Sequence, residues 1–146
     1  MAFVNNGDLA NENDNELTTP FWEACARGIL VRPVCDACGT NFFTPSLVCP
    51  ACQSTEWAYQ PSSGLGRVYS YTTVHRGPDS TWEVPYVLAI IDMSEGWTML
   101  SQLVITPPDE ASPRDVIGLD VKVVFVPENR PPHRVLPMFT PQEAMS

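Results

Sequence analysis

The chain has 146 residues, 44% of them hydrophobic, which is enough for one ordinary domain or two small ones with a real core. Its formal net charge is -9 and it has a single lysine, so the chain as a whole is poorly suited to gripping nucleic-acid phosphates. It contains neither a run of about eighteen apolar residues nor a signal-peptide pattern, so we expect no membrane span and a cytoplasmic location.

The stretch TTPFWEACARGIL has residues typical of the start and end of a short helix. Thr19 is a candidate N-cap, Pro20 occupies the first helical position and Gly28 ends the helix. Helical spacing places Cys25 on an apolar face, where a thiol with no base nearby in the sequence is expected to behave as a small buried hydrophobe. Trp22 falls outside that face and is free to reach another surface.

Two Cys-x-x-Cys pairs follow, formed by Cys35, Cys38, Cys49 and Cys52. Each pair can form a tight turn whose backbone N–H groups point at the thiolates, and two such turns place four sulfurs in a tetrahedron suited to zinc. Because protein atoms would fill all four positions, this Zn²⁺ is expected to be structural and to supply folding energy. Iron in a rubredoxin-like electron-transfer site and a redox-active dithiol remain alternatives, since iron accepts the same geometry.

After the cysteines, the chain is dominated by segments rich in Val, Ile, Tyr and Thr that are separated by Gly, Pro, Asp and Ser. The sequence SEG predicts a tight hairpin between the second and third segments. Five antiparallel strands with one longer connection before the fourth fit a small Greek-key barrel of the OB type, and a five-stranded open sheet is the main alternative. The predicted strands are residues 66–76, 85–93, 97–105, 120–126 and 134–139.

These observations predict a small, mostly β protein in three parts. Residues 1–17 are rich in Asn, Asp and Glu and are expected to form a flexible tail. Residues 18–60 would hold the N-terminal helix and a rubredoxin-like zinc ribbon. Residues 61–146 would form the five-stranded OB-fold barrel with a C-terminal tail.

Other candidates for chemistry are few. His75 and His133 are the only histidines, and neither stands in a recognisable nucleophile motif. GLGR at residues 64–67 lacks the spacing of a phosphate loop and predicts a bend that enters a barrel strand. An OB barrel also suggests a single-strand nucleic-acid binder, and strand alternation places Tyr69, Tyr71 and Thr73 on one face with His75. The acidic net charge opposes this alternative.

Several motifs occur in order along residues 17–141: FWEACARGIL, VCDACGTNFFTPSLVCPAC, GLGRVYSYTTVHRG, PYVLAIIDM, IGLDVKVVF and LPMFTP. Together they resemble a family of bacterial and archaeal proteins, long catalogued as a domain of unknown function beside thiolase genes. The resemblance implies an N-terminal helical piece, a rubredoxin-like zinc ribbon and a C-terminal OB barrel, in agreement with the architecture expected from the residues alone.

The resemblance also implies a function. Members look like noncatalytic subunits that bind thiolase-superfamily enzymes, either thiolases or retro-aldolases that shorten steroid side chains, in hetero-oligomers such as heterotetramers. The partner would carry the catalytic residues and act on acyl-CoA thioesters, so no catalytic residue is expected in this chain. Aromatic residues suited to such an interface are Trp22, Trp57, Trp82 and Trp97.

Some members of this family look as if they help to accommodate the CoA portion of the substrate. CoA is polyanionic, so its contacts would be cationic side chains. Between the two cysteine pairs, Phe42, Phe43 and Leu47 are expected to present a surface held in shape by the metal. The candidate CoA contacts are Arg27, Arg32, Arg67, His75 and Arg76.

Overall fold

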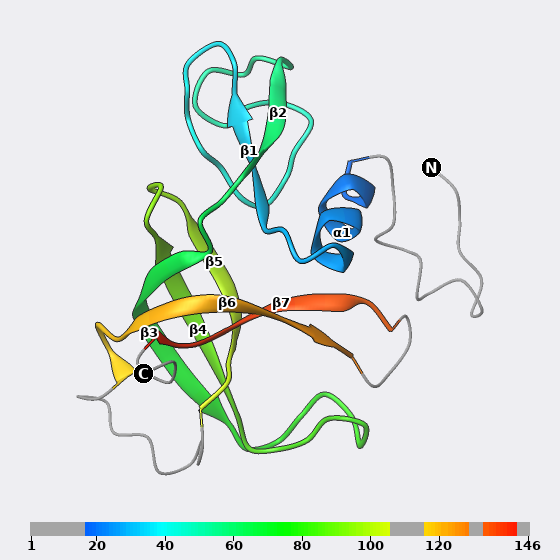
Figure 1. Cartoon of the computed structure of the whole chain (residues 1–146), viewed down its shortest axis with the longest axis vertical. Coiled ribbons are helices and arrows are strands. Elements are labelled where there is room, and N and C mark those ends of the chain that lie inside the picture. The colour runs from blue at the N-terminus through cyan, green and yellow to red at the C-terminus, as the bar shows by residue number, and fades with distance from the viewer. Residues whose placement is uncertain (1–16, 106–115, 129–132, 143–146) are drawn as a thin grey trace.

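The structure is a computed structural model that describes residues 17–105, 116–128 and 133–142. The predicted flexible tail, the predicted C-terminal tail and most of the connection at 106–119 lie outside the described residues. A small two-stranded lobe stands on one end of a barrel, and the helix lies beside their junction (Figure 1).

All five predicted barrel strands are present, with bounds that differ from the prediction by up to two residues at each end. Two further strands in the cysteine lobe were missed by the sequence analysis, because they are short and interrupted by Pro and Cys and therefore lack a strand pattern. The elements are α1 (Thr19–Ala26), β1 (Val31–Cys35), β2 (Trp57–Pro61), β3 (Leu65–Val74), β4 (Tyr86–Met93), β5 (Thr98–Leu103), β6 (Asp120–Pro127) and β7 (Val135–Pro141).

Helix α1 forms where it was predicted, but its N-cap is wrong in the prediction. The capping residue is Thr18, whose side chain makes no capping hydrogen bond, and Thr19 is already helical. Pro20 lies in the first turn, where its fixed φ suits the helix and its missing N–H costs nothing. Gly28 has a φ of 77° and its N–H donates to the Cys25 carbonyl at 3.0 Å, which ends the helix as expected.

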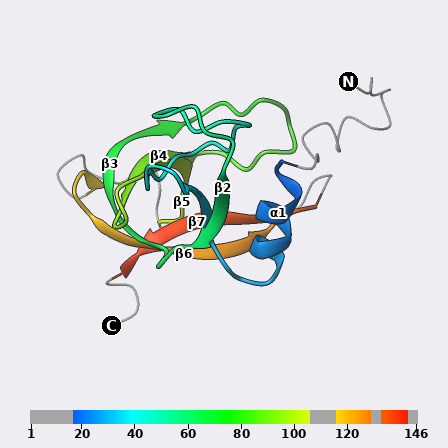
Figure 2. The same cartoon turned by 90° about the horizontal axis from the view of Figure 1, so that it is seen from above.

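The strands β3 to β7 form a closed barrel in the order β3-β4-β5-β7-β6, which confirms the OB architecture and excludes the open sheet. The prediction that all pairs are antiparallel is wrong, since β5 and β7 run parallel where Leu103 is opposite Phe139. A closed ring with an odd number of strands cannot alternate direction all the way round, so one parallel pair is required. Figure 2 shows the ring from above, with α1 outside its wall.

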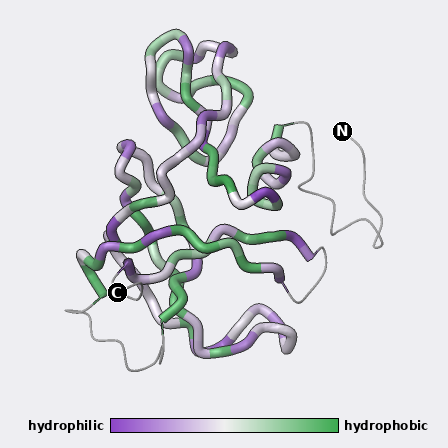
Figure 3. The backbone as a smooth tube through the Cα atoms, in the orientation of Figure 1, coloured by the Kyte–Doolittle hydropathy of each residue, from purple (hydrophilic) through white to green (hydrophobic). Residues whose placement is uncertain are grey.

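The helix shares its hydrophobic core with the barrel. Buried residues of α1, among them Phe21 and Cys25, belong to the same cluster as the fully buried barrel residues Ile91 and Phe139. The cysteine lobe has a separate and much smaller cluster. In Figure 3, where the backbone is coloured by hydropathy, hydrophobic residues lie along the barrel strands. The barrel and helix therefore form one packed unit, on which the cysteine lobe is mounted.

The GLGR motif forms the predicted bend into the barrel. Gly64 has a φ of 76° immediately before β3 begins, a conformation that L side chains rarely adopt. At Gly66, a Cβ atom would lie 2.7 Å from the backbone oxygen of Asp92 on the neighbouring strand. The motif thus turns the chain out of the lobe and lets β3 pack closely on β4.

A β-bulge in β3 overturns the predicted face shared by Tyr69, Tyr71 and His75. The register moves from Val68 opposite Ile91 to Ser70 opposite Ile90, so the intervening residue has no partner. Tyr69 is consequently 64% exposed, whereas Tyr71 packs against the core. His75 lies beyond the end of β3 and not on it. The stacking face expected of a nucleic-acid binder is therefore absent from this strand.

Candidate functional site

Both cysteine pairs lie in the same kind of turn. In the first, the N–H of Cys35 donates to the Thr40 carbonyl and the N–H of Gly39 donates to the Cys35 carbonyl, both at 2.9 Å. The second turn repeats the pattern, with the N–H of Gln53 donating to the Cys49 carbonyl at 2.8 Å. The residue after each pair has a positive φ, 78° at Gly39 and 65° at Gln53. A glycine is a recognisable signal for this conformation in a sequence, whereas the glutamine at the second turn gives none.

The four sulfurs converge as a zinc site requires. Cys35 Sγ lies 3.6 Å from Cys52 Sγ, and Cys38 Sγ lies 3.7 Å from Cys49 Sγ. All four sulfurs lie within 4.8 Å of one another. A tetrahedron with Zn–S bonds of about 2.3 Å has sulfur–sulfur edges of about 3.8 Å, which the two shortest spacings match closely. The donor set is complete and forms a closed structural zinc site.

The ionisation of the four thiols also favours the binding of a cation. Hydrogen bonds with the side chain and backbone of Thr40 lower the pKa of Cys38 to about 6. At Cys52 a backbone hydrogen bond from Ser54 acts in the same direction, but the neighbouring Cys35 and Cys38 outweigh it and raise the pKa to about 12. Four clustered thiolates repel one another unless a divalent ion offsets their charge, which Zn²⁺ does.

The fifth cysteine, Cys25, is a buried and unreactive thiol, as predicted. Cys25 is 0% exposed, and burial raises the pKa of its thiol to about 12. A thiol in such a site stays protonated and unreactive at neutral pH.

Glu95, in the predicted β4–β5 hairpin, ties the barrel to the segment leading out of β2. Its carboxylate accepts hydrogen bonds from Ser62 Oγ at 2.8 Å, the Ser63 N–H at 2.7 Å and Trp97 Nε1 at 2.9 Å. Partial burial alone would raise the pKa of Glu95, but these donors outweigh it and lower the pKa to about 2. The hairpin is therefore an anchor as well as a turn.

Arg32 extends the same anchor into the cysteine lobe. Its Nε donates to Asn41 Oδ1 at 2.9 Å, and Asn41 Nδ2 donates to the Glu95 carbonyl at 3.0 Å. The guanidinium also donates to the carbonyls of Gln60 and Pro61. Arg32 therefore has an intramolecular role that competes with the predicted role in CoA binding.

The other four CoA candidates do not form one cluster. Arg27 is exposed at the C-cap of α1, and Arg67, exposed on β3, pairs with Asp120 at 3.1 Å. His75 and Arg76 are exposed just beyond the other end of β3, about 25 Å along the strand from Arg67 at the usual rise per residue. Of these four residues, His75 and Arg76 are adjacent in the sequence.

The aromatic residues proposed for an interface divide into buried and surface groups. Trp97 is 4% exposed and belongs to the barrel core, and Trp57 packs against Phe42 at a ring distance of 5.5 Å. Phe42 is itself 5% exposed, so the expectation that it presents a surface is wrong; it fills the small core of the zinc ribbon. Trp22 and Trp82 instead line a common groove.

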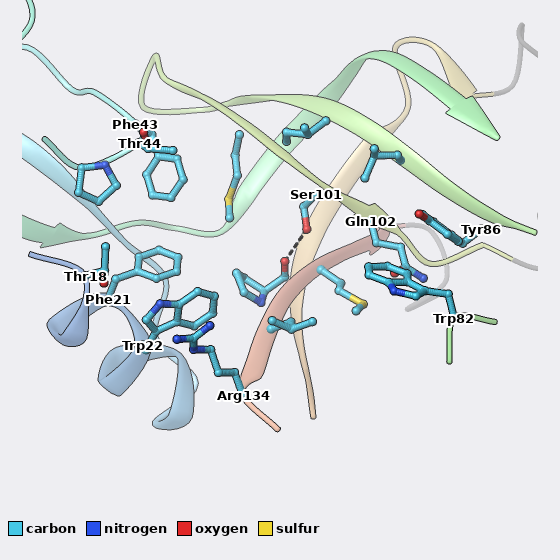
Figure 4. Close-up of a pocket in the computed structure, with 17 residues that line it drawn as sticks. Thr18, Phe21, Trp22, Phe43, Thr44, Trp82, Tyr86, Ser101, Gln102 and Arg134 are labelled. Atoms are coloured by element: carbon cyan, nitrogen blue, oxygen red, sulfur yellow. Dashed lines mark hydrogen bonds between the residues drawn. The ribbon is translucent and has the colours of Figure 1, made fainter. Parts of the chain in front are cut away.

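This groove has a volume of about 630 Å³ and runs between α1, the loop after Phe42 and the outer face of β4, β5 and β7. Phe43 lines it from the ribbon and Arg134 from the start of β7 (Figure 4). The sequence analysis missed Arg134 and the contribution of β7, since no motif marks them. The one available signal was the unbroken apolar run YVLAII at the start of β4, which alternation with a solvated face would have interrupted.

Comparisons with known proteins agree with the fold. A model described as the rubredoxin-like zinc ribbon domain of ChsH2 matches residues 22–58, and one described as the C-terminal OB-fold domain of ChsH2 matches residues 59–126. A DUF35 domain-containing scaffold protein of Methanocaldococcus jannaschii is 39% identical over 102 residues, which cover 68% of this chain and 69% of that protein. The chain belongs to the ChsH2/DUF35 family. The family resemblance expected from the sequence motifs is thereby confirmed.

Two further relatives bear on function. A probable enoyl-CoA hydratase alpha subunit of Thermomonospora curvata is 35% identical over 83% of this chain, which spans only 36% of that relative's length. A chain of the solved Ltp2-ChsH2(DUF35) aldolase is 33% identical, with a TM-score of 0.73 over 87% of this chain and 95% of that one. A DUF35 protein of Sulfolobus solfataricus, 16% identical with a TM-score of 0.59, shares the fold. Within the described residues, α1 is too short to cross a membrane.

Proposed function

We propose that this chain is a noncatalytic accessory subunit that binds and stabilises a thiolase-superfamily enzyme acting on acyl-CoA thioesters. The observation that carries the proposal is the likeness to the chain of the Ltp2-ChsH2(DUF35) aldolase, which extends over 95% of that chain. The name of the archaeal relative, a scaffold protein, points in the same direction. Retro-aldol cleavage of steroid side chains is the pathway we favour.

The chemistry of the described residues supports an accessory role. Cys35, Cys38, Cys49 and Cys52 would fill the coordination shell of a zinc ion, which would leave no position for water or substrate. The fifth thiol is buried and its pKa is raised to about 12. We therefore assign the metal and the thiols to folding and the reaction to a partner subunit. The chain and this partner would form a cytoplasmic hetero-oligomer such as a heterotetramer.

Contact with CoA is part of the proposal. His75 and Arg76 are exposed neighbours beyond β3, and Arg27 is exposed at the end of α1, so these cations are accessible to a phosphate group. Arg67 and Arg32 would have to exchange their contacts with Asp120 and with backbone carbonyls for the ligand. We therefore place the first three ahead of the other two as CoA contacts.

The experiment is co-expression with each thiolase-superfamily subunit of the same genome, followed by affinity and size-exclusion chromatography. The expected result is one subunit that copurifies in equimolar amount and is insoluble or inactive alone. A solitary chain that retains none of these subunits would overturn the proposal. A single-strand nucleic-acid binder would instead bind oligonucleotides with a strong salt dependence, and a rubredoxin-like carrier would contain iron in place of zinc.

A further inference from the structure

The outer face of β4 is apolar where a solvated barrel strand would be polar. Val87, Ala89 and Ile91 point into the barrel and are at most 1% exposed. Alternation therefore turns Leu88 and Ile90 outward. A strand that is apolar on both faces is typical of a sheet covered on both sides, but none of the described elements covers this one completely.

The apolar surface continues across the neighbouring strands. Leu100 on β5 is directly opposite Ile90 on β4, and the two are 62% and 37% exposed. Met138, which flanks the buried Phe139 on β7, also lines the groove. Val84, ahead of β4, is 45% exposed and lies outside the groove lining, as does Ile90. The apolar area thus extends beyond the cavity, which favours a protein surface over a small ligand as the occupant.

A stacked aromatic pair and a cation–π pair lie at opposite ends of the groove (Figure 4). Trp82 and Tyr86 stack with ring centroids 5.3 Å apart, and the Arg134 guanidinium lies 4.6 Å from the centre of the Trp22 ring. Among the described residues that line the groove, Arg134 is the only charged one, in a chain whose net charge is -9. Trp, Tyr, Met and Arg are the residue types enriched in protein interfaces, and all four occur here.

We infer that this groove is the docking surface for the enzyme subunit of the proposed function, on which the inference rests. The partner segment would insert large apolar side chains over Leu100, between the stacked aromatic pair and the cation–π pair. Charge complementarity specifies the rest of its chemistry, since a carboxylate on that segment would meet Arg134. Trp22 holds the guanidinium in place before binding, which lowers the entropy lost when the ion pair forms.

The test uses the complex of the full-length zinc-loaded chain co-expressed with the thiolase-superfamily subunit retained by the wild type, and its dissociation constant is measured by mass photometry on dilution of the purified complex. Leu100→Asp places a charge in the centre of the groove and is expected to raise that constant at least about thirty-fold. The matched control is Ile117→Asp, which alters a side chain of 47% exposure beside Gly118, whose N–H bonds to Val68 of β3. It is expected to stay within about twofold of the wild type. Zinc content and circular dichroism establish that each variant is folded.

A charge reversal tests the chemistry of the partner segment. Arg134→Glu is expected to weaken binding about tenfold or more, whereas Arg134→Lys keeps the charge and should recover most of the affinity. Unchanged affinity for both Leu100→Asp and Arg134→Glu would overturn the inference but leave the proposed function standing. Failure of the wild type to retain any such enzyme would overturn both. A wild-type homodimer in light scattering that Leu100→Asp converts to a monomer would assign the groove to a second copy and overturn the inference alone.

Discussion

The zinc ribbon and the barrel are joined in one short chain but are stabilised by different forces. The barrel and α1 share a cluster of buried apolar residues that closes around Phe139, whereas the core of the ribbon contains only Cys35, Phe42 and Cys49, with Trp57 packed against it. Burial of apolar area can support the first, but a core of this size cannot support the second. One half of the molecule is therefore held by packing and the other by a metal.

Removal of one zinc ligand should produce the largest effect, and only in the ribbon. Cys38→Ser eliminates a thiolate from a site whose metal contributes about 10–16 kcal/mol of folding free energy in small zinc domains. We expect the variant to lose zinc and the amides of β1 and β2 to lose protection from hydrogen exchange, while the strands of the barrel keep theirs. Cys25→Ala removes a buried thiol outside the site and should retain about one zinc per chain. If the amides of β1 and β2 stayed protected without zinc, the ribbon would not depend on the metal for its stability.

The second largest effect should come from the centre of the barrel and should leave the metal in place. Phe139 is 0% exposed and lies opposite Val123 and Leu103. Phe139→Ala is expected to lower the free energy of unfolding by about 3–5 kcal/mol, from lost burial and a residual cavity. Denaturant unfolding measures the loss, and zinc content should equal that of the wild type whenever the chain is folded. Loss of zinc from the folded variant would show that the two regions depend on each other.

Two glycines, one in the barrel and one in the ribbon, distinguish packing from backbone conformation as the limit on stability. Gly66→Ala in β3 brings a Cβ within 2.7 Å of both the Asp92 oxygen and the Ile91 side chain, so we expect about 1–3 kcal/mol of destabilisation. Gly39 has nothing within 4 Å and needs only its positive φ, so Gly39→Asn should cost a few tenths of a kcal/mol. Thermal unfolding compares the variants. Equal losses would mean that packing limits the ribbon as it limits the barrel.

The sequence predicted the parts of the fold that depend on local pattern. The metal ligands were evident because Cys-x-x-Cys spacing is fixed by the turn, and the barrel strands were evident because β-branched segments are separated by turn residues. A closed five-stranded barrel requires one parallel pair, but the strand pattern does not indicate that β5 and β7 form it, and no residue signal marks the bulge at Tyr69. The groove was missed for a related reason: Trp22 and Arg134 come from opposite ends of the chain and meet only after folding.

The junction between the two regions is expected to give the smallest effect. Glu95→Gln keeps the shape of the side chain but replaces an ionised acceptor for Ser62, Ser63 and Trp97 with a neutral one. The side chain is partly solvated, so the expected cost is only about 1 kcal/mol, or about 2–4 °C in the unfolding midpoint.

The pH dependence at the junction has a definite sign. The pKa of Glu95 is lowered from 4.5 to about 2, so its contribution to stability is complete above pH 4.5 and disappears as the pH falls toward 2. The difference in stability between wild type and Glu95→Gln should therefore shrink with acidification, measured over the range in which zinc content stays constant. A carboxyl resonance of Glu95 that titrates near 4.5 would contradict the anchor. Asn41 and Arg32 connect the same hairpin to the ribbon. The variant should therefore also increase hydrogen exchange at β1 more than at β4. This result would identify Glu95 as the residue that attaches the zinc ribbon to the barrel.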